Sequence, residues 1–69
     1  MVLFSTGCPQ CYVLEVKLQQ KNIDFEITDN FQELIDMGIK RLPVLKLDSG
    51  EYLDFSKALN FINEWSDNN

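Results

Sequence analysis

The two cysteines of the chain are separated by only two residues, in the stretch Ser5–Tyr12, which reads STGCPQCY. An apolar run, Val2–Phe4, precedes this stretch and a helical pattern of apolar residues follows it, which predicts a turn from a buried strand into a helix. Proline is favoured in the first turn of a helix, because the N–H that it lacks would have no partner there. We therefore expect Cys8 to cap the helix and Pro9 to begin it.

The two thiols of this motif are predicted to differ. The free N–H groups and the positive end of the helix dipole favour the thiolate form of Cys8. Cys11 lies nearly one turn further along, on the side that carries Leu14 and Leu18, so we expect it to be more buried and less ionised. An exposed thiolate with a buried second thiol suits dithiol chemistry, in which Cys8 attacks a disulfide and Cys11 resolves the mixed disulfide.

Length and composition limit the class of protein. A chain of 69 residues predicts a single domain over 1–69. Secreted mini-proteins usually carry several disulfides, whereas two cysteines this close can staple almost nothing. The net charge of −5 argues against a nucleic-acid partner, and no apolar run approaches the roughly 18 residues that a membrane span needs. We expect a cytoplasmic monomer with no nucleic-acid or membrane partner.

The middle of the chain alternates between strand and helix patterns. A helix is predicted over 9–21 by its apolar stripe. Ile23–Thr28 alternates apolar and polar residues, as in a strand with one face toward a core. Asn30 and Glu33 resemble a capping box for a short helix that Gly38 ends.

The last third of the chain predicts a hairpin and a helix. Val44–Leu47 forms a third strand, Asp48–Gly50 a tight turn and Glu51–Leu53 an antiparallel return. A last helix begins within 54–56, and its apolar face is formed by Ala58, Phe61, Ile62 and Trp65. Residues 66–69 are expected to be a frayed polar tail. The element order predicts an α/β fold, a mixed four-stranded sheet flanked by three helices, with its first two strands parallel.

This order of elements, the CPQC motif after the first strand and Leu42-Pro43 before the third strand resemble a minimal glutaredoxin of the thioredoxin superfamily. The resemblance spans Val2–Trp65 and implies a thioredoxin-like fold. It also implies a cis bond before Pro43, which would face the cysteines and leave the backbone of Leu42 free to pair with an extended substrate. The base rate for a bond before proline alone favours trans.

The same resemblance implies a small thiol-disulfide oxidoreductase that reduces protein or glutathione mixed disulfides. Cys8 would be the nucleophile and Cys11 the resolving thiol, with no metal and no permanently bound cofactor. Glutathione or thioredoxin reductase would supply the electrons. The substrate-binding residues would be Pro9, Gln10, Tyr12, Leu42, Pro43, Asp54 and Ser56. Helix capping is the plainer role for Asp54 and Ser56.

Two departures from the glutaredoxin pattern bear on glutathione binding. Phe4–Gly7 lacks the basic residue that commonly precedes the first cysteine, and Glu51–Ser56 lacks the paired glycines before the last helix. Lys40 or Arg41 would then have to supply the positive charge. The pattern of the thioredoxin branch, with a tryptophan before the first cysteine and Gly-Pro within the motif, is also absent.

Two other functions are consistent with the same cysteines. One is a metal or iron-sulfur site in a dimer, because one chain offers two thiols and no histidine whereas zinc usually takes four ligands. The other is a non-catalytic interaction module on a thioredoxin-like fold, in which the cysteines only pack. An exposed cysteine beside a proline at a helix start fits that packing role poorly.

Overall fold

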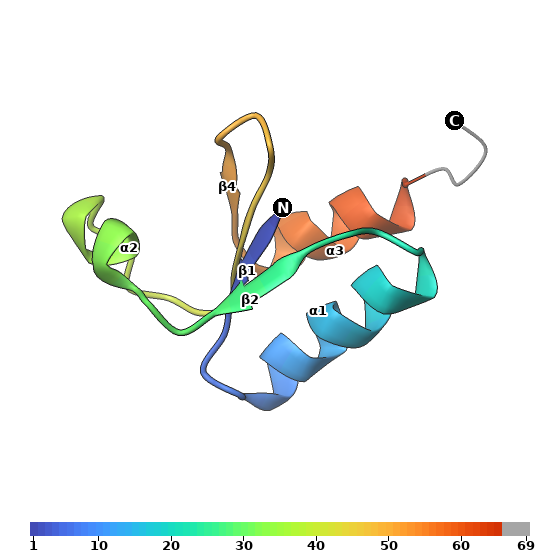
Figure 1. Cartoon of the computed structure of the whole chain (residues 1–69), viewed down its shortest axis with the longest axis horizontal. Coiled ribbons are helices and arrows are strands. Elements are labelled where there is room, and N and C mark those ends of the chain that lie inside the picture. Colours follow the sequence, from blue (N-terminus) through green and yellow to red (C-terminus); the bar gives the residue numbers. More distant parts are fainter. Residues whose placement is uncertain (66–69) are drawn as a thin grey trace.

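The computed structural model describes residues 1–65 as one mixed sheet with three helices (Figure 1). The elements are β1 (Val2–Phe4), α1 (Pro9–Gln20), β2 (Glu26–Thr28), α2 (Gln32–Asp36), β3 (Val44–Lys46), β4 (Tyr52–Leu53) and α3 (Phe55–Asn63). The strand order is β2-β1-β3-β4, with β1 parallel to β2 and antiparallel to β3. The predicted α/β class, element order and four-stranded mixed sheet are confirmed, while the predicted tail at 66–69 lies outside the described residues.

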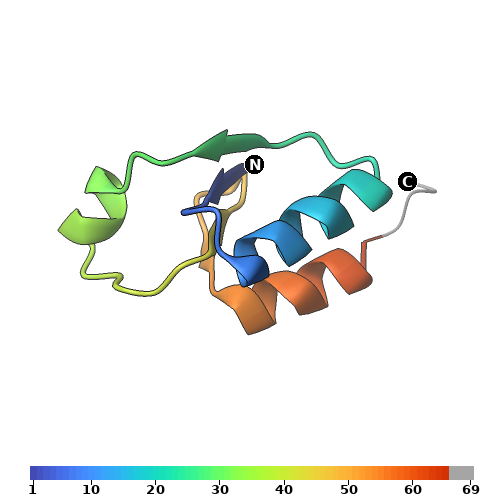
Figure 2. The same cartoon turned by 90° about the horizontal axis from the view of Figure 1, so that it is seen from below.

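The helices cover the sheet unequally. Helices α1 and α3 lie side by side on one face, and the short α2 stands alone on the other (Figures 1 and 2). The larger core, under α1 and α3, buries Leu3, Leu14, Leu18, Ile23, Leu45, Leu53, Ala58 and Ile62. The smaller core, under α2, buries Phe4, Leu34 and Val44. Strand β1 supplies both layers, since Leu3 faces one and Phe4 the other, which confirms a strand buried on both faces.

Strand β2 is shorter than the alternating pattern predicts. It begins at Glu26, because the chain first turns at Asn22, whose φ is 57°. Ile23 is buried in the larger core, but Ile27 is 51% exposed. The expectation that Ile27 faces the core is wrong. Strand β2 is at one edge of the sheet, whereas α3 packs against β3 and β4, toward the other edge.

Helix α2 begins without the capping box that the sequence predicts. Asn30 does accept a hydrogen bond through Oδ1, from the N–H of Gln32 at 3.2 Å, but the N-cap residue is Phe31 and makes no side-chain cap. The carboxylate of Glu33 turns instead to the sheet, where it accepts hydrogen bonds from Lys46 Nζ at 3.0 Å and from the Tyr52 hydroxyl. The helix ends before Gly38, as expected.

The hairpin and the last helix follow the prediction closely. The N–H of Leu47 donates to the carbonyl of Glu51 at 2.8 Å, and Gly50 takes the left-handed turn position with a φ of 95°. Helix α3 ends at Asn63, so Trp65 lies beyond it and is 37% exposed, which corrects its predicted place on the buried face. Among residues 1–65, no helix has both the length and the apolar character to cross a membrane.

Candidate active site

The CPQC motif lies where β1 gives way to α1. The N–H of Ser5 donates to the carbonyl of Thr28 at 3.1 Å, which continues the β1 to β2 pairing up to the turn. Gly7 then adopts a φ of 82°, a conformation that favours glycine, and Pro9 opens the helix as predicted. Cys8 is the N-cap residue of α1, and its sulfur accepts a hydrogen bond from the N–H of Cys11 at 3.1 Å.

The two thiols are both free, and they differ in access. Cys8 is half-buried, whereas Cys11 is fully buried beside Leu14 and Leu18 on the inner face of α1. An incoming disulfide can therefore reach Cys8 Sγ and not Cys11 Sγ. The predicted difference in burial between the two thiols is confirmed.

The electrostatics of Cys11 differ from the expectation. Burial raises the pKa of this thiol, but hydrogen bonds from the side chains of Cys8 and Ser5 and from the backbone of Thr6 and Cys8 outweigh it and lower the pKa to about 7. The Thr6 hydroxyl lies 4.0 Å from Cys11 Sγ. Cys11 is therefore not the poorly ionised thiol that its burial alone suggests.

A hollow of about 220 Å³ lies beside the motif and brings together residues that are far apart in sequence. Gln10 from α1, Leu42 and Pro43 from the loop before β3, and Asp54 and Ser56 from the start of α3 all line it. The Leu42–Pro43 peptide bond is cis, as the resemblance implies. Within residues 1–65, the backbone N–H and carbonyl of Leu42 make no hydrogen bond. Five of the seven residues predicted to bind substrate therefore share one surface.

This hollow carries both signs of charge. Asp54 caps α3 through a hydrogen bond that its Oδ1 accepts from the N–H of Lys57 at 2.9 Å, which confirms capping as one of its roles. The N–H groups of Phe55 and Ser56, in the first turn of α3, have no partner within the described residues. Arg41 also lines the hollow. A zwitterionic ligand would find N–H donors and a guanidinium for its carboxylate, and a carboxylate for its ammonium group.

The remaining predicted residues lie elsewhere. Pro9 and Tyr12 do not line this hollow, and Tyr12 is 65% exposed. Of the two cations considered from the sequence, Arg41 lines the hollow and Lys40 does not. The one lining residue that the sequence did not suggest is Phe55, whose only signal is its place directly after the cap Asp54.

No group of three or more His, Cys, Asp or Glu side chains is placed to hold a metal ion in the part of the chain that the structure describes. A single chain offers two thiols and no histidine, so a site of four thiolates would need donors from a second copy. Comparison of the chain with protein-family models, with curated proteins and with solved structures finds no match.

Proposed function

We propose that this chain is a small thiol-disulfide oxidoreductase of the glutaredoxin type, with Cys8 as nucleophile and Cys11 as resolving thiol. One observation carries the proposal: the sulfur of the half-buried Cys8 caps a helix and accepts a hydrogen bond at 3.1 Å from the N–H of Cys11, whose own thiol is buried. A helix N-terminus favours thiolate, which is the nucleophilic form of cysteine. A structural cysteine pair has no need of this arrangement.

The reaction transfers two electrons from the dithiol to a substrate disulfide. The Cys8 thiolate attacks one substrate sulfur, forms a mixed disulfide with it and expels the other substrate sulfur as a thiolate, which takes up a proton. The Cys11 thiolate then attacks Cys8 Sγ and expels the second substrate thiol. The products are two substrate thiols and a Cys8–Cys11 disulfide, which an external reductant must reduce before the next cycle.

The two cysteines are expected to fail in different ways when replaced. Cys8→Ser should abolish disulfide reduction, because Cys11 is too buried to attack. Cys11→Ser should still attack a disulfide and then accumulate the mixed disulfide on Cys8. Acid quenching, alkylation and intact-protein mass spectrometry measure both outcomes, and circular dichroism checks that each variant folds. Full turnover by Cys8→Ser would overturn the proposal.

We further propose that glutathione is the reductant, with its γ-glutamyl end in the hollow beside the motif. Its carboxylate would meet Arg41 and the free N–H groups of α3, and its ammonium group would meet Asp54. The unpaired backbone of Leu42 would bind the cysteinyl part of the tripeptide. In this arrangement Arg41, on the loop before β3, supplies the positive charge that a basic residue before the first cysteine commonly supplies in glutaredoxins.

Arg41→Gln tests this binding mode. It should raise the KM for glutathione about fivefold to tenfold, the effect of losing one charge-assisted contact, while Lys21→Gln removes a cation far from the hollow and should leave the KM unchanged. The oxidised protein is offered glutathione or, in parallel, NADPH with thioredoxin reductase. Reduction by the reductase alone would refute glutathione as the donor and leave the dithiol chemistry intact.

A further inference from the structure

The loop over residues 39–42 forms a ridge between three hollows of the surface. Leu42 lines both the hollow beside the motif and an apolar hollow under α2, whereas Arg41 lines the motif hollow and a third hollow toward β4. Ile39 and Lys40 line the second and the third. The three hollows therefore share their walls, and the surface beside the dithiol continues in two directions.

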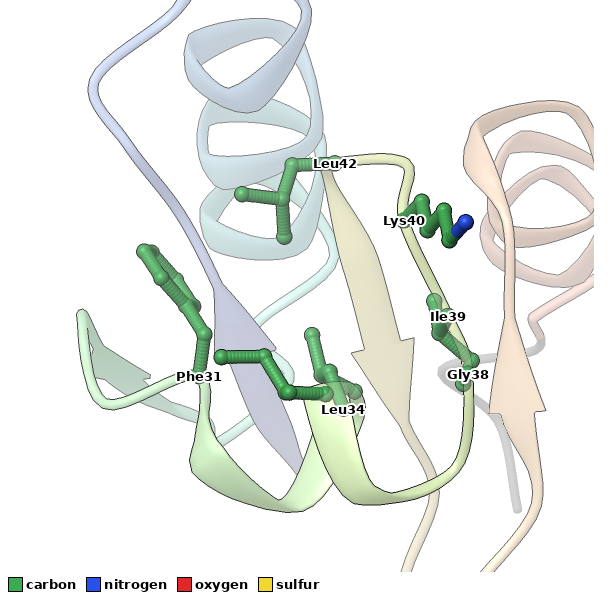
Figure 3. Close-up of a pocket in the computed structure, with 7 residues that line it drawn as sticks. Phe31, Leu34, Gly38, Ile39, Lys40 and Leu42 are labelled. Carbon is green, nitrogen blue, oxygen red and sulfur yellow. The ribbon is translucent and has the colours of Figure 1, made fainter.

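The hollow under α2 has a volume of about 280 Å³ and is lined almost entirely by apolar side chains. Phe31, Leu34 and Leu42 point toward one another across it (Figure 3). Ile35 also lines it and is 64% exposed. A volume of this size accepts one large aliphatic or aromatic side chain.

The hollow toward β4, of about 290 Å³, concentrates positive charge on an acidic protein. Lys40, Arg41 and Lys57 line it, which is three of the six basic residues in a chain of net charge −5. None of the three forms an ion pair within the described residues. Asp54 is the one carboxylate that lines this hollow, and it already accepts the cap hydrogen bond. The nearby Glu33 carboxylate, which accepts from the Tyr52 hydroxyl, is paired with Lys46. This surface therefore attracts negative charge, while the rest of the chain opposes it.

We propose that these two hollows dock the disulfide-bearing partner, an extended protein segment with acidic residues and one bulky apolar residue close to its cysteine. The inference rests on the proposed function and adds the substrate class. The cysteine of the partner segment lies at Cys8, and the segment passes Leu42. Its apolar side chain enters the hollow under α2, and its acidic side chains contact Lys40, Arg41 and Lys57. Two observations select this occupant: both hollows share walls with the hollow that Gln10 of the motif lines, and one of them gathers positive charge on an otherwise acidic chain.

Single-turnover reduction of synthetic peptides tests the inference. Each peptide carries one cysteine as a mixed disulfide with thionitrobenzoate, whose release is followed by absorbance. The first has two glutamates and a leucine near the cysteine, the second has lysines in place of the glutamates, and the third has serine in place of the leucine. The reduced full chain should react with the first peptide about tenfold faster than with the third. The advantage over the second should be about fivefold at low salt and disappear in roughly 0.5 M salt.

Two exposed substitutions locate the preferences on the surface. Lys40→Glu should remove the preference for glutamates, and Ile35→Ser should reduce the preference for leucine about threefold or more. Lys21→Glu and Ile27→Ser are the controls, because they change another lysine and another exposed isoleucine (51% exposed, against 64% for Ile35) away from the loop. All four variants should reduce 2-hydroxyethyl disulfide at the wild-type rate.

The outcomes separate the docking surface from the chemistry. Equal rates with all three peptides, together with reduction of 2-hydroxyethyl disulfide, would overturn the inference and leave the proposed function standing. Peptide preferences that survive both Lys40→Glu and Ile35→Ser would also overturn it. Failure to reduce any of these disulfides would instead refute the proposed function.

Discussion

At the scale of single residues, Cys11 differs most from what its burial predicts. Burial alone would raise its pKa, yet hydrogen bonds from the Cys8 side chain, from the Ser5 hydroxyl and from the backbone of Thr6 and Cys8 lower the pKa to about 7. In the mixed disulfide Cys8 has no thiol proton left to donate, but the hydrogen bonds from Ser5 and from the backbone of Thr6 and Cys8 still favour the Cys11 thiolate that attacks in the second step, without a general base. The chain contains no histidine that could serve as one.

This pKa predicts how the stability of the reduced protein depends on pH. The Cys11 thiol titrates at about 7 in the folded protein, compared with 9.0 as its ordinary value. The unfolded chain therefore binds the proton more tightly, and the free energy of unfolding should rise with pH between 7 and 9. This contribution should be fully present above 9 and lost as the pH falls through 7.

Urea denaturation of the reduced protein across pH 6 to 9 measures this dependence, with Cys11→Ser as the reference. The difference in unfolding free energy between the two proteins should grow from pH 7 to pH 9. A difference that stays constant would show that the thiolate of Cys11 is not favoured in the folded state.

At the scale of elements, local signals predicted those parts of the fold that local chemistry determines. Pro9 set the start of α1, and Gly50 and Asp54 marked the hairpin turn and the cap of α3. The sequence-based predictions failed where tertiary contacts determine the position of a side chain. Glu33 does not cap α2, because its carboxylate accepts hydrogen bonds from Tyr52 and Lys46 of the sheet. These hydrogen bonds lower the pKa of Glu33, and the bond from Tyr52 has the larger effect.

The candidate site shows the same division. The CPQC spacing and the start of a helix are visible in the sequence, so Cys8, Cys11 and Gln10 could be identified from it. The hollow depends on the packing of α3 against the sheet beside the loop before β3, which no local pattern encodes. Asp54 was found through its capping signal, whereas Phe55 beside it carried none. The charge reversal around Lys40 likewise needed the fold, because Lys57 is distant in sequence.

Asp54 is predicted to have two separable roles at the start of α3. Asp54→Ala should lower the free energy of unfolding by about 1 kcal/mol, because the N-cap acceptor for Lys57 N–H is lost. Asp54→Asn keeps an acceptor and should stay within a few tenths of a kcal/mol of the wild type. Both variants remove the carboxylate from the hollow and should raise the KM for glutathione equally. Urea denaturation and steady-state kinetics measure the two roles, and equal destabilisation by Ala and Asn would contradict the capping role.

At the scale of the whole molecule, the two layers of the sheet are unequal. The hydrophobic cluster under α1 and α3 has eight buried members, whereas the cluster under α2 has three, and α2 itself supplies only Leu34. A layer with so little buried apolar surface should open locally, at a lower free energy than global unfolding. The proposed docking hollow is built on this layer, so its walls belong to the least stable part of the fold.

Two leucine substitutions test this division. Leu34→Ala should expose the backbone of α2 to hydrogen exchange and leave the protection of α1 and β1 nearly unchanged, because the larger core does not depend on it. Leu14→Ala removes a fully buried side chain from the larger core and should cost about 2–5 kcal/mol, most of the margin expected for so short a chain. It should therefore increase exchange throughout residues 1–65.

Hydrogen exchange followed by mass spectrometry measures both patterns. Uniform loss of protection in Leu34→Ala would mean that the two layers unfold as one unit, and then binding of a substrate under α2 would stabilise the whole fold rather than α2 alone.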